Sequence, residues 1–407
     1  MAGRRYMATV TVAGMVLAAV TAPPAMALDN GRATTPPMVW SEWLQAGCNV
    51  SEDVIEDGAD ALVSQGYAKA GYDTVQVDDC WQGGRDSTGE LFSSPSRFPH
   101  GVKYLADETH AKGLQFGIYG TPGTMTCAGY YNGFKAYPVG SRNHERQDAD
   151  TWAAQGVDYL KYDWCGADWD SEARKSGLSV KNQQVRQYGL MRDALKASGR
   201  DITYAISQYG KYDVAQWAGD IANMWRTSSD IGDSFSQIES IIDTQKGISQ
   251  YSRPGAWNDP DGIRFDATTL TMDEKRTHFG MWCMFAAPIT FALKTPLSSL
   301  TDEERALAQN PRLIAIDQDP LGQAATYVST RQNVQLWTRP LKNGDKAIAL
   351  FNMNSSSTTI TVPYSDLKAD GTWKAVDQFN GSAKPAFDSI TVTIPAHGTT
   401  IWRLSRA

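Results

Sequence analysis

The chain has 407 residues, of which 42% are hydrophobic, enough for one large folded domain and a smaller second one. A formal net charge of −7 without a long basic run argues against a nucleic-acid partner. Its five histidines are scattered without metal-ligand spacing, so we expect neither a metal ion nor another cofactor.

The first 27 residues have the organisation of a secretory signal peptide. Arg4 and Arg5 give a positive start, an apolar run covers 8–22, and a small-residue cleavage site ends at Ala27. The apolar run is too short and wrongly flanked for a membrane span, and no later stretch approaches that length. We therefore predict a secreted mature protein without a membrane anchor. The sequence does not define its oligomeric state.

Short apolar segments then alternate with helical patterns. Strands are expected at 38–43, 74–79, 115–119, 159–163, 202–207, 221–226, 255–258 and 289–293. Helices are expected at 53–70, 102–112, 145–155, 183–197, 234–245 and 272–285. This alternation predicts an α/β fold, a (β/α)8 TIM barrel over residues 28–319. A doubly wound sheet is the alternative, but no Gly-rich phosphate loop follows the first strand.

The pattern changes near Pro320. Short β-rich runs follow, separated by turn residues such as Asn380 and Gly381, at 334–338, 347–352, 358–362, 373–377, 390–394 and 399–404. They predict a C-terminal antiparallel β-sandwich over residues 320–407.

The segment 157–165 carries the most informative polar group. Its apolar and aromatic residues indicate a buried strand that ends with Lys161 and Asp163. A carboxylate held rigidly there, beside a cation that keeps it ionised, would suit a nucleophile or a charge-stabilising group. Taken alone, a salt-bridged strand end explains the pair equally well.

Other predicted strand ends also carry charged residues. Asp78 and Asp79 follow the second strand, Arg226 and Asp230 follow the sixth, and Asp261 follows the seventh. Because barrel strands present these ends on one face, the acids, cations and neighbouring tryptophans predict a sugar pocket. Two of the acids would supply the pair that glycoside hydrolysis needs. Individually, loop capping, a rigid turn or a helix N-cap would explain each motif.

Together these motifs resemble glycoside hydrolase family 27, the family of α-galactosidases and α-N-acetylgalactosaminidases, over essentially the whole mature chain. The segments that carry the resemblance are 28–31, 35–40, 71–81, 117–119, 161–163, 259–261, 318–322 and 395–398. The second-strand and fourth-strand motifs, GYDTVQVDDCW and KYD, are the most specific of these.

The resemblance implies a retaining α-glycosidase in which Asp163 is the nucleophile and Asp230 the acid/base. The residues it assigns to substrate binding are Trp43, Asp78, Asp79, Tyr119, Lys161, Gln208, Arg226 and Asp261.

Five cysteines allow two disulfides in an exported protein. Cys283 lies in an apolar run, which favours a buried free thiol. The resemblance implies which bridges form, namely Cys48–Cys80 and Cys127–Cys165.

Several segments depart from the family pattern. The first-strand motif GWNSWN reads VWSEWL at 39–44, and the acid of YSDAG is lost at 119–123. The fifth-strand CEWG, which shapes recognition of the sugar 2-position, reads SQYG at 207–210, so that Gln208 replaces an acid. The segment 130–143 looks longer than the usual loop and carries several aromatic residues.

The expected function is hydrolysis of terminal α-galactosides in an oligosaccharide or polysaccharide. Trp43, Asp78 and Asp79 match the residues that hold the 4- and 6-hydroxyls of galactose. An isomaltose-releasing α-glucanase of the same family is the alternative suggested by the altered segments. A carbohydrate-binding protein without catalysis is the alternative from another class, and the presence of both catalytic acids counts against it.

Overall fold

The structure is a computed structural model that describes residue 28 and residues 30–131 and 138–406. The expected signal peptide and residues 132–137 of the longer loop lie outside the described residues. No helix in the described part of the chain is long and apolar enough to cross a membrane.

Eight parallel strands form the sheet of the larger, N-terminal domain, in the order β10-β1-β2-β5-β6-β7-β8-β9. They are β1 (Met38–Ser41), β2 (Thr74–Gln76), β5 (Gln115–Gly120), β6 (Tyr159–Asp163), β7 (Thr203–Ser207), β8 (Met224–Arg226), β9 (Trp257–Asp259) and β10 (Ile289–Ala292). Ile263, just after β9, donates its N–H to Thr290 of β10 at 2.7 Å and so closes the ring. The predicted (β/α)8 barrel is confirmed.

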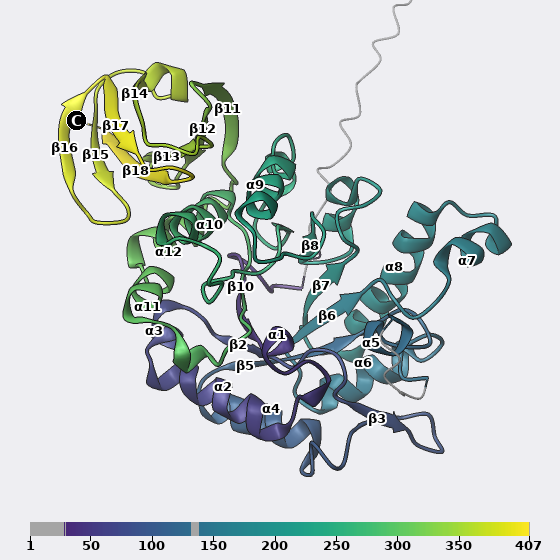
Figure 1. Ribbon diagram of the computed structural model, residues 1–407. Helices are drawn as coiled ribbons and strands as arrows, with labels where there is room; N and C mark the ends of the chain where they lie inside the picture. Colours follow the sequence, from purple (N-terminus) through teal and green to yellow (C-terminus); the bar gives the residue numbers. More distant parts are fainter. Residues whose placement is uncertain (1–27, 29, 132–137, 407) are drawn as a thin grey trace, which may run out of the picture.

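Helices surround this sheet (Figure 1). They are α1 (Trp43–Ala46), α2 (Glu52–Ser64), α3 (Tyr67–Ala70), α4 (Gly101–Ala111), α5 (Cys127–Tyr131), α6 (Glu145–Ala154), α7 (Trp169–Ser176), α8 (Val180–Ser198), α9 (Phe235–Thr244), α10 (Met272–Phe285), α11 (Asp302–Ala308) and α12 (Pro311–Asp317). The helix expected at 53–70 is two helices, because Gly66 has a φ of +86° and interrupts the α-helical backbone. A hairpin of β3 (Gln82–Arg85) and β4 (Leu91–Ser93), which the sequence pattern did not predict, follows β2.

The C-terminal domain is an antiparallel β-sandwich, as predicted. Its larger sheet has the order β11-β12-β13-β18-β15-β16 and its smaller sheet pairs β14 with β17. The strands are β11 (Thr326–Arg331), β12 (Val334–Pro340), β13 (Lys346–Asn352), β14 (Thr358–Pro363), β15 (Trp373–Asp377), β16 (Ala383–Phe387), β17 (Ser389–Ile394) and β18 (Thr399–Arg406). Alternate side chains of β14 and β17 are buried against the larger sheet, which gives the sandwich its own apolar core.

The sandwich packs on helices α9 and α10 of the barrel (Figure 1). The imidazole of His397, in the turn before β18, stacks on Phe235 at the start of α9 with ring centroids 4.6 Å apart. Its Nδ1 atom lies 2.8 Å from Oε1 of Glu274 in α10, and its carbonyl accepts a 2.7 Å hydrogen bond from Thr277. Arg339 is fully buried and donates to the backbone carbonyls of Cys283 and Asp317. The interface is therefore both apolar and specifically hydrogen-bonded.

Candidate active site

A cavity of about 500 Å³ opens at the carboxyl ends of the barrel strands, where TIM barrels place their active sites. Nine of the ten expected catalytic and substrate-binding residues line it, namely Trp43, Asp78, Asp79, Tyr119, Lys161, Asp163, Arg226, Asp230 and Asp261. Residues that are almost 220 positions apart in the sequence therefore meet on one face of the sheet.

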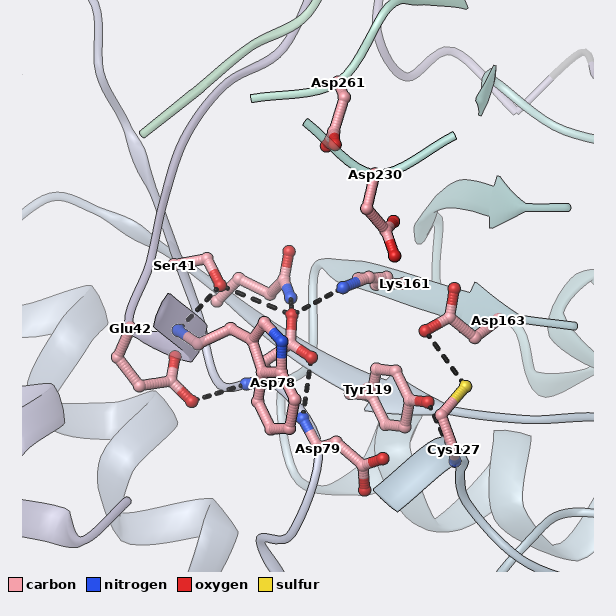
Figure 2. Close-up of polar contacts among 12 residues, drawn as sticks. Ser41, Glu42, Asp78, Asp79, Tyr119, Cys127, Lys161, Asp163, Asp230 and Asp261 are labelled. Atoms are coloured by element: carbon pink, nitrogen blue, oxygen red, sulfur yellow. Dashed lines mark hydrogen bonds and ion pairs between the residues drawn. The ribbon is translucent and has the colours of Figure 1, made fainter. Parts of the chain in front are cut away.

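Asp163 ends strand β6 and lines the cavity as a buried carboxyl. The Sγ atom of Cys127 lies 3.4 Å from its Oδ2 atom, and this sulfur is bonded to Cys165. A disulfide sulfur carries no hydrogen, so this contact, drawn as a dashed line in Figure 2, is not a hydrogen bond. Among the described residues, no N–H or O–H group donates to the Asp163 carboxylate. Its oxygens are therefore left free toward the cavity.

Burial raises the pKa of Asp163 to about 6, although Lys161 acts to lower it. The sequence pattern predicts that Lys161 keeps Asp163 ionised. In the structure the Nζ atom of Lys161 instead bonds to Oδ2 of Asp78 at 2.8 Å. The cation therefore offsets only part of the desolvation of Asp163.

Asp78 is the centre of a buried polar network (Figure 2). Its Oδ2 atom also accepts hydrogen bonds from Gln76 at 2.6 Å and Ser41 at 3.3 Å. Its backbone N–H donates to Oε1 of Glu42 at 2.8 Å. Burial, and then the negative charge of Asp78, raise the pKa of the Glu42 carboxyl to about 8. Glu42 is therefore a largely neutral acid at pH 7, and it positions Asp78 by accepting its backbone N–H. In the sequence, Glu42 stands out only as part of an altered motif.

Asp79 and Tyr119 are fixed by the short helix α5. The carboxylate of Asp79 accepts from the N–H of Ala128 at 2.8 Å and from the N–H of Cys80 at 2.6 Å. The hydroxyl of Tyr119 accepts a longer bond, 3.4 Å, from the N–H of Cys127. These contacts hold two polar groups at the floor of the cavity.

Asp230 lies across the cavity from Asp163, and Figure 2 shows the two carboxyl groups pointing toward one another. Arg226 is 5% exposed, and its Nη2 atom lies 3.1 Å from Asp230 and 3.0 Å from Asp261. Asp261 also accepts the N–H of Ile231, the residue after Asp230, at 2.6 Å. The side chain of Asp230 is 75% exposed and therefore accessible to a substrate. A carboxylate attached to the cavity floor and a second one open to solvent can act on opposite sides of a glycosidic bond.

The structure does not bring Gln208 to the cavity. Its side chain is fully buried, and its Oε1 atom accepts the backbone N–H of Lys211 at 2.8 Å. Ser207 and Tyr209 line the cavity in its place. Successive side chains of a strand point to opposite faces, so Ala205 and Ser207 of β7 share the cavity face, whereas Tyr209 lies beyond the strand in a turn with a φ of +65°.

Tyr209 lies directly beside the nucleophile candidate. Its hydroxyl oxygen lies 3.8 Å from the Sγ atoms of both Cys127 and Cys165, and the Arg226 guanidinium lies 5.8 Å from its ring centroid. The tyrosine and the disulfide together form the wall next to Asp163.

The structure contains both expected disulfides, Cys48–Cys80 and Cys127–Cys165, and Cys283 is buried and unpaired among the described cysteines. Within the described residues, no three His, Cys, Asp or Glu side chains are grouped in a way that would hold a metal ion.

Comparison with known families covers nearly the whole described chain. Residues 35–319 match a family described as "Alpha galactosidase A". Residues 331–404 match the "Alpha galactosidase C-terminal beta sandwich domain".

Individual proteins agree with these matches. The α-galactosidase of Cyamopsis tetragonoloba is 38% identical over 340 residues, which are 83% of this chain and 78% of the relative. The structure of α-galactosidase I from Mortierella vinacea superposes with a TM-score of 0.86 at 29% identity, covering 93% of this chain and 99% of the other. A Saccharomyces cerevisiae α-galactosidase structure with raffinose has a TM-score of 0.84 at 27% identity, covering 94% and 100% of the two chains.

Proposed function

Because the chain belongs to the α-galactosidase family, glycoside hydrolase family 27, we propose that this glycoside hydrolase removes terminal α-D-galactosyl residues from oligosaccharides with retention of configuration. The observation that carries the proposal is the pair Asp163 and Asp230, which face one another over a cavity at the barrel mouth. An oligosaccharide substrate agrees with the raffinose-bound relative.

In the proposed mechanism Asp163 attacks the anomeric carbon while Asp230 gives a proton to the departing glycosidic oxygen. A covalent galactosyl ester on Asp163 results. Asp230 then takes a proton from water, which attacks the same carbon and releases the sugar. The absence of donors to Asp163 among the described residues supports its role, since its lone pairs are not occupied by protein groups.

The remaining cavity residues are proposed to hold the galactosyl ring. Asp78 and Asp79 are ionisable acceptors on the cavity floor, and Trp43 presents an indole beside them. Carboxylates accept hydrogen bonds from sugar hydroxyls, and an indole stacks on the apolar sugar face. Lys161, Arg226 and the hydroxyl of Tyr119 supply further donors.

An isomaltose-releasing α-glucanase is the second candidate, because residues of the cavity wall differ from the family pattern. Ser207 and Tyr209 stand where the family pattern has Cys and Trp. Tyr131 also lines the cavity, and 69% of it is exposed, which suits stacking of a second sugar ring. The non-catalytic alternative is not retained, because the family match identifies a glycoside hydrolase.

A substrate screen tests the proposal. We expect wild-type protein to hydrolyse nitrophenyl α-galactoside in preference to the α-N-acetylgalactosaminide, the β-L-arabinopyranoside and dextran. NMR should show the α-anomer as the first product, because double displacement retains configuration. Asp163→Asn serves as the inactive control. Release of isomaltose from dextran without α-galactoside cleavage would replace the proposal by the α-glucanase alternative.

We also propose that the chain is exported and cleaved after Ala27, leaving a barrel at 28–319 and a sandwich at 320–407. The apolar run near the N-terminus and the two disulfides support export. Mass spectrometry of protein secreted from an expression host should find Leu28 at the mature N-terminus, and an intact Met1 terminus would contradict the proposal.

A further inference from the structure

The position of the Asp230 carboxyl depends on its backbone rather than on its own side-chain contacts. Its side chain is 75% exposed, and Arg226 is its one charged or hydrogen-bonding partner among the described residues. Residues 227–234 connect β8 to α9 without regular secondary structure. An acid on such a loop delivers its proton accurately only if the loop itself is held in place.

The loop is held next to Asp230 by the hydrogen bond from the Ile231 N–H to Asp261, and again three residues after Asp230, at Asp233. The carboxylate of Asp233 forms ion pairs with Arg264 and Lys294. Its backbone carbonyl accepts a hydrogen bond from the hydroxyl of Thr269. All three partners belong to the segment between β9 and the residues just after β10, so that Asp233 joins the loop to the neighbouring part of the barrel mouth.

Arg264 makes this attachment rigid because it is itself buried. Its side chain is only 2% exposed, whereas that of Asp233 is 34% exposed. Removing one partner of a buried ion pair is strongly unfavourable, since the other charge loses its compensation. The remaining acid near Arg264 is Asp266, 3.6 Å from its Nε atom. The neighbouring His278 has a pKa lowered to about 3 by burial and by Arg264, so it stays neutral.

We propose that Asp233 is the positioning residue of the acid/base: its ion pair with buried Arg264 holds Asp230 where it can protonate the departing glycosidic oxygen. This inference rests on the proposed function. Asp233 does not line the cavity, so it acts through the loop. In the first chemical step, the bond from the anomeric carbon to the leaving oxygen breaks, the Asp163 ester forms, and the proton of Asp230 moves to that oxygen.

Leaving groups of different acidity separate a positioning role from a general structural one. Melibiose has a poor sugar leaving group that requires protonation, whereas 2,4-dinitrophenolate departs without it. For Asp233→Asn we expect kcat/KM for melibiose to fall about 10- to 100-fold, within the range of general acid catalysis. The value for 2,4-dinitrophenyl α-galactoside should stay within about threefold of wild type.

Asp266→Asn is the matched control. It removes the other acid beside Arg264, a carboxylate that also accepts the backbone N–H groups of Lys294 and Thr295. Asp266 is not on the Asp230 loop, so we expect a lower melting temperature with equal effects on both substrates. Thr269→Val, which removes only the bond to the Asp233 carbonyl, provides a second variant in case Asp233→Asn does not fold, and its melibiose-specific loss should be smaller.

Equal losses of Asp233→Asn on both substrates, or wild-type values on both, would overturn the positioning role. If only Thr269→Val folds, the absence of any melibiose-specific loss would do the same. Wild-type protein that hydrolyses neither galactoside would instead reject the proposed function, so the two failures are distinguishable.

Discussion

Asp163 combines two properties that set the pH range of the enzyme. As the proposed nucleophile it must be ionised, and burial raises its pKa to about 6. We therefore expect kcat/KM to fall below about pH 6, approaching a tenfold loss per pH unit. A profile from pH 4 to 9 with nitrophenyl α-galactoside checks this. A flat profile down to pH 4.5 would show that Asp163 ionises at its ordinary pKa.

The same pKa has an opposite effect on stability. The folded protein holds a proton on Asp163 up to about pH 6, whereas the ordinary pKa of the free side chain is 3.8. Stability is therefore lost as the pH rises from about 4 to 6, by up to about 3 kcal/mol for a two-unit difference.

Asp163→Asn removes this pH-dependent cost. We expect denaturant unfolding to show the variant gaining free energy of unfolding relative to wild type between pH 4 and 7, while turnover is abolished. A difference in unfolding free energy that does not change with pH would contradict the assignment. Loss of turnover together with a gain in stability would identify Asp163 as a residue whose buried charge serves activity at a cost in stability.

The cavity wall leads to a prediction about specificity. Tyr209 lines the cavity where the family pattern has Trp, and a larger indole would close the space beside the sugar. We expect Tyr209→Trp to raise kcat/KM for nitrophenyl α-galactoside about tenfold, the usual effect of filling a specificity pocket. Gln208→Glu is the control, because its side chain points away from the cavity, and it should change kcat/KM by less than about twofold. The reverse pattern would mean that Gln208 contacts the sugar.

Among the elements, the barrel strands were the most predictable. All eight expected strands formed, because buried parallel strands are continuous apolar runs and their flanks are marked by charged residues. The β3–β4 hairpin was not predicted, since Gly83 and Gly84 lower its β-propensity. The edge strands β11 and β16 were also missed, because few of their residues are buried and no apolar alternation marks them.

The site was predictable where it depends on motifs and less so where it depends on packing. The acids and cations at the strand ends were found from the sequence, and all lie at the cavity. The neutral role of Glu42 and the anchoring role of Asp233 depend on burial and on partners more than 30 residues away, which no local pattern reveals. The position of Gln208 also depends on packing: it follows the end of β7, and its side chain accepts the N–H of Lys211 and not a group in the cavity.

The two disulfides connect strand ends of the barrel to neighbouring loops. Their sequence separations are 32 and 38 residues, for which the chain-entropy estimate is roughly 3–4 kcal/mol each. We expect thiol titration to detect no cysteine in the native protein and one, Cys283, after denaturation without reductant. Five reactive thiols after denaturation would show that the bridges do not form.

For the molecule as a whole, the contact between barrel and sandwich predicts cooperative unfolding. Phe285 of α10 and Trp337 of β12 pack edge to face across the interface with ring centroids 5.2 Å apart. Because this apolar cluster spans both domains, we expect a single calorimetric transition. Two well-separated transitions would show that the domains unfold independently.

Substitution of Arg339 measures how much the interface between the domains contributes to the free energy of unfolding. Its guanidinium is fully buried, so Arg339→Met leaves the backbone carbonyls of Cys283 and Asp317 without their donor. We expect a loss of about 3 kcal/mol of unfolding free energy, because two buried acceptors lose their hydrogen bonds. Arg331→Met, which removes a surface ion pair with Asp366, is the matched control and should cost less than about 1 kcal/mol. Similar losses in both variants would remove the distinction.

The stacking of His397 on Phe235 couples the sandwich energetically to sugar binding at the barrel mouth. Phe235 begins helix α9, five residues after Asp230. The turn at His397, which stacks on Phe235, is therefore connected to the cavity through this short stretch of backbone. Thermodynamic linkage is reciprocal: where galactose binding stabilises this turn, a stabilised turn strengthens galactose binding by the same coupling free energy. Saturation with galactose should thus slow amide exchange at His397 and Gly398, and a sandwich weakened far from the pocket should bind galactose less tightly. The smaller domain would in this way contribute to the affinity for galactose without lining the cavity.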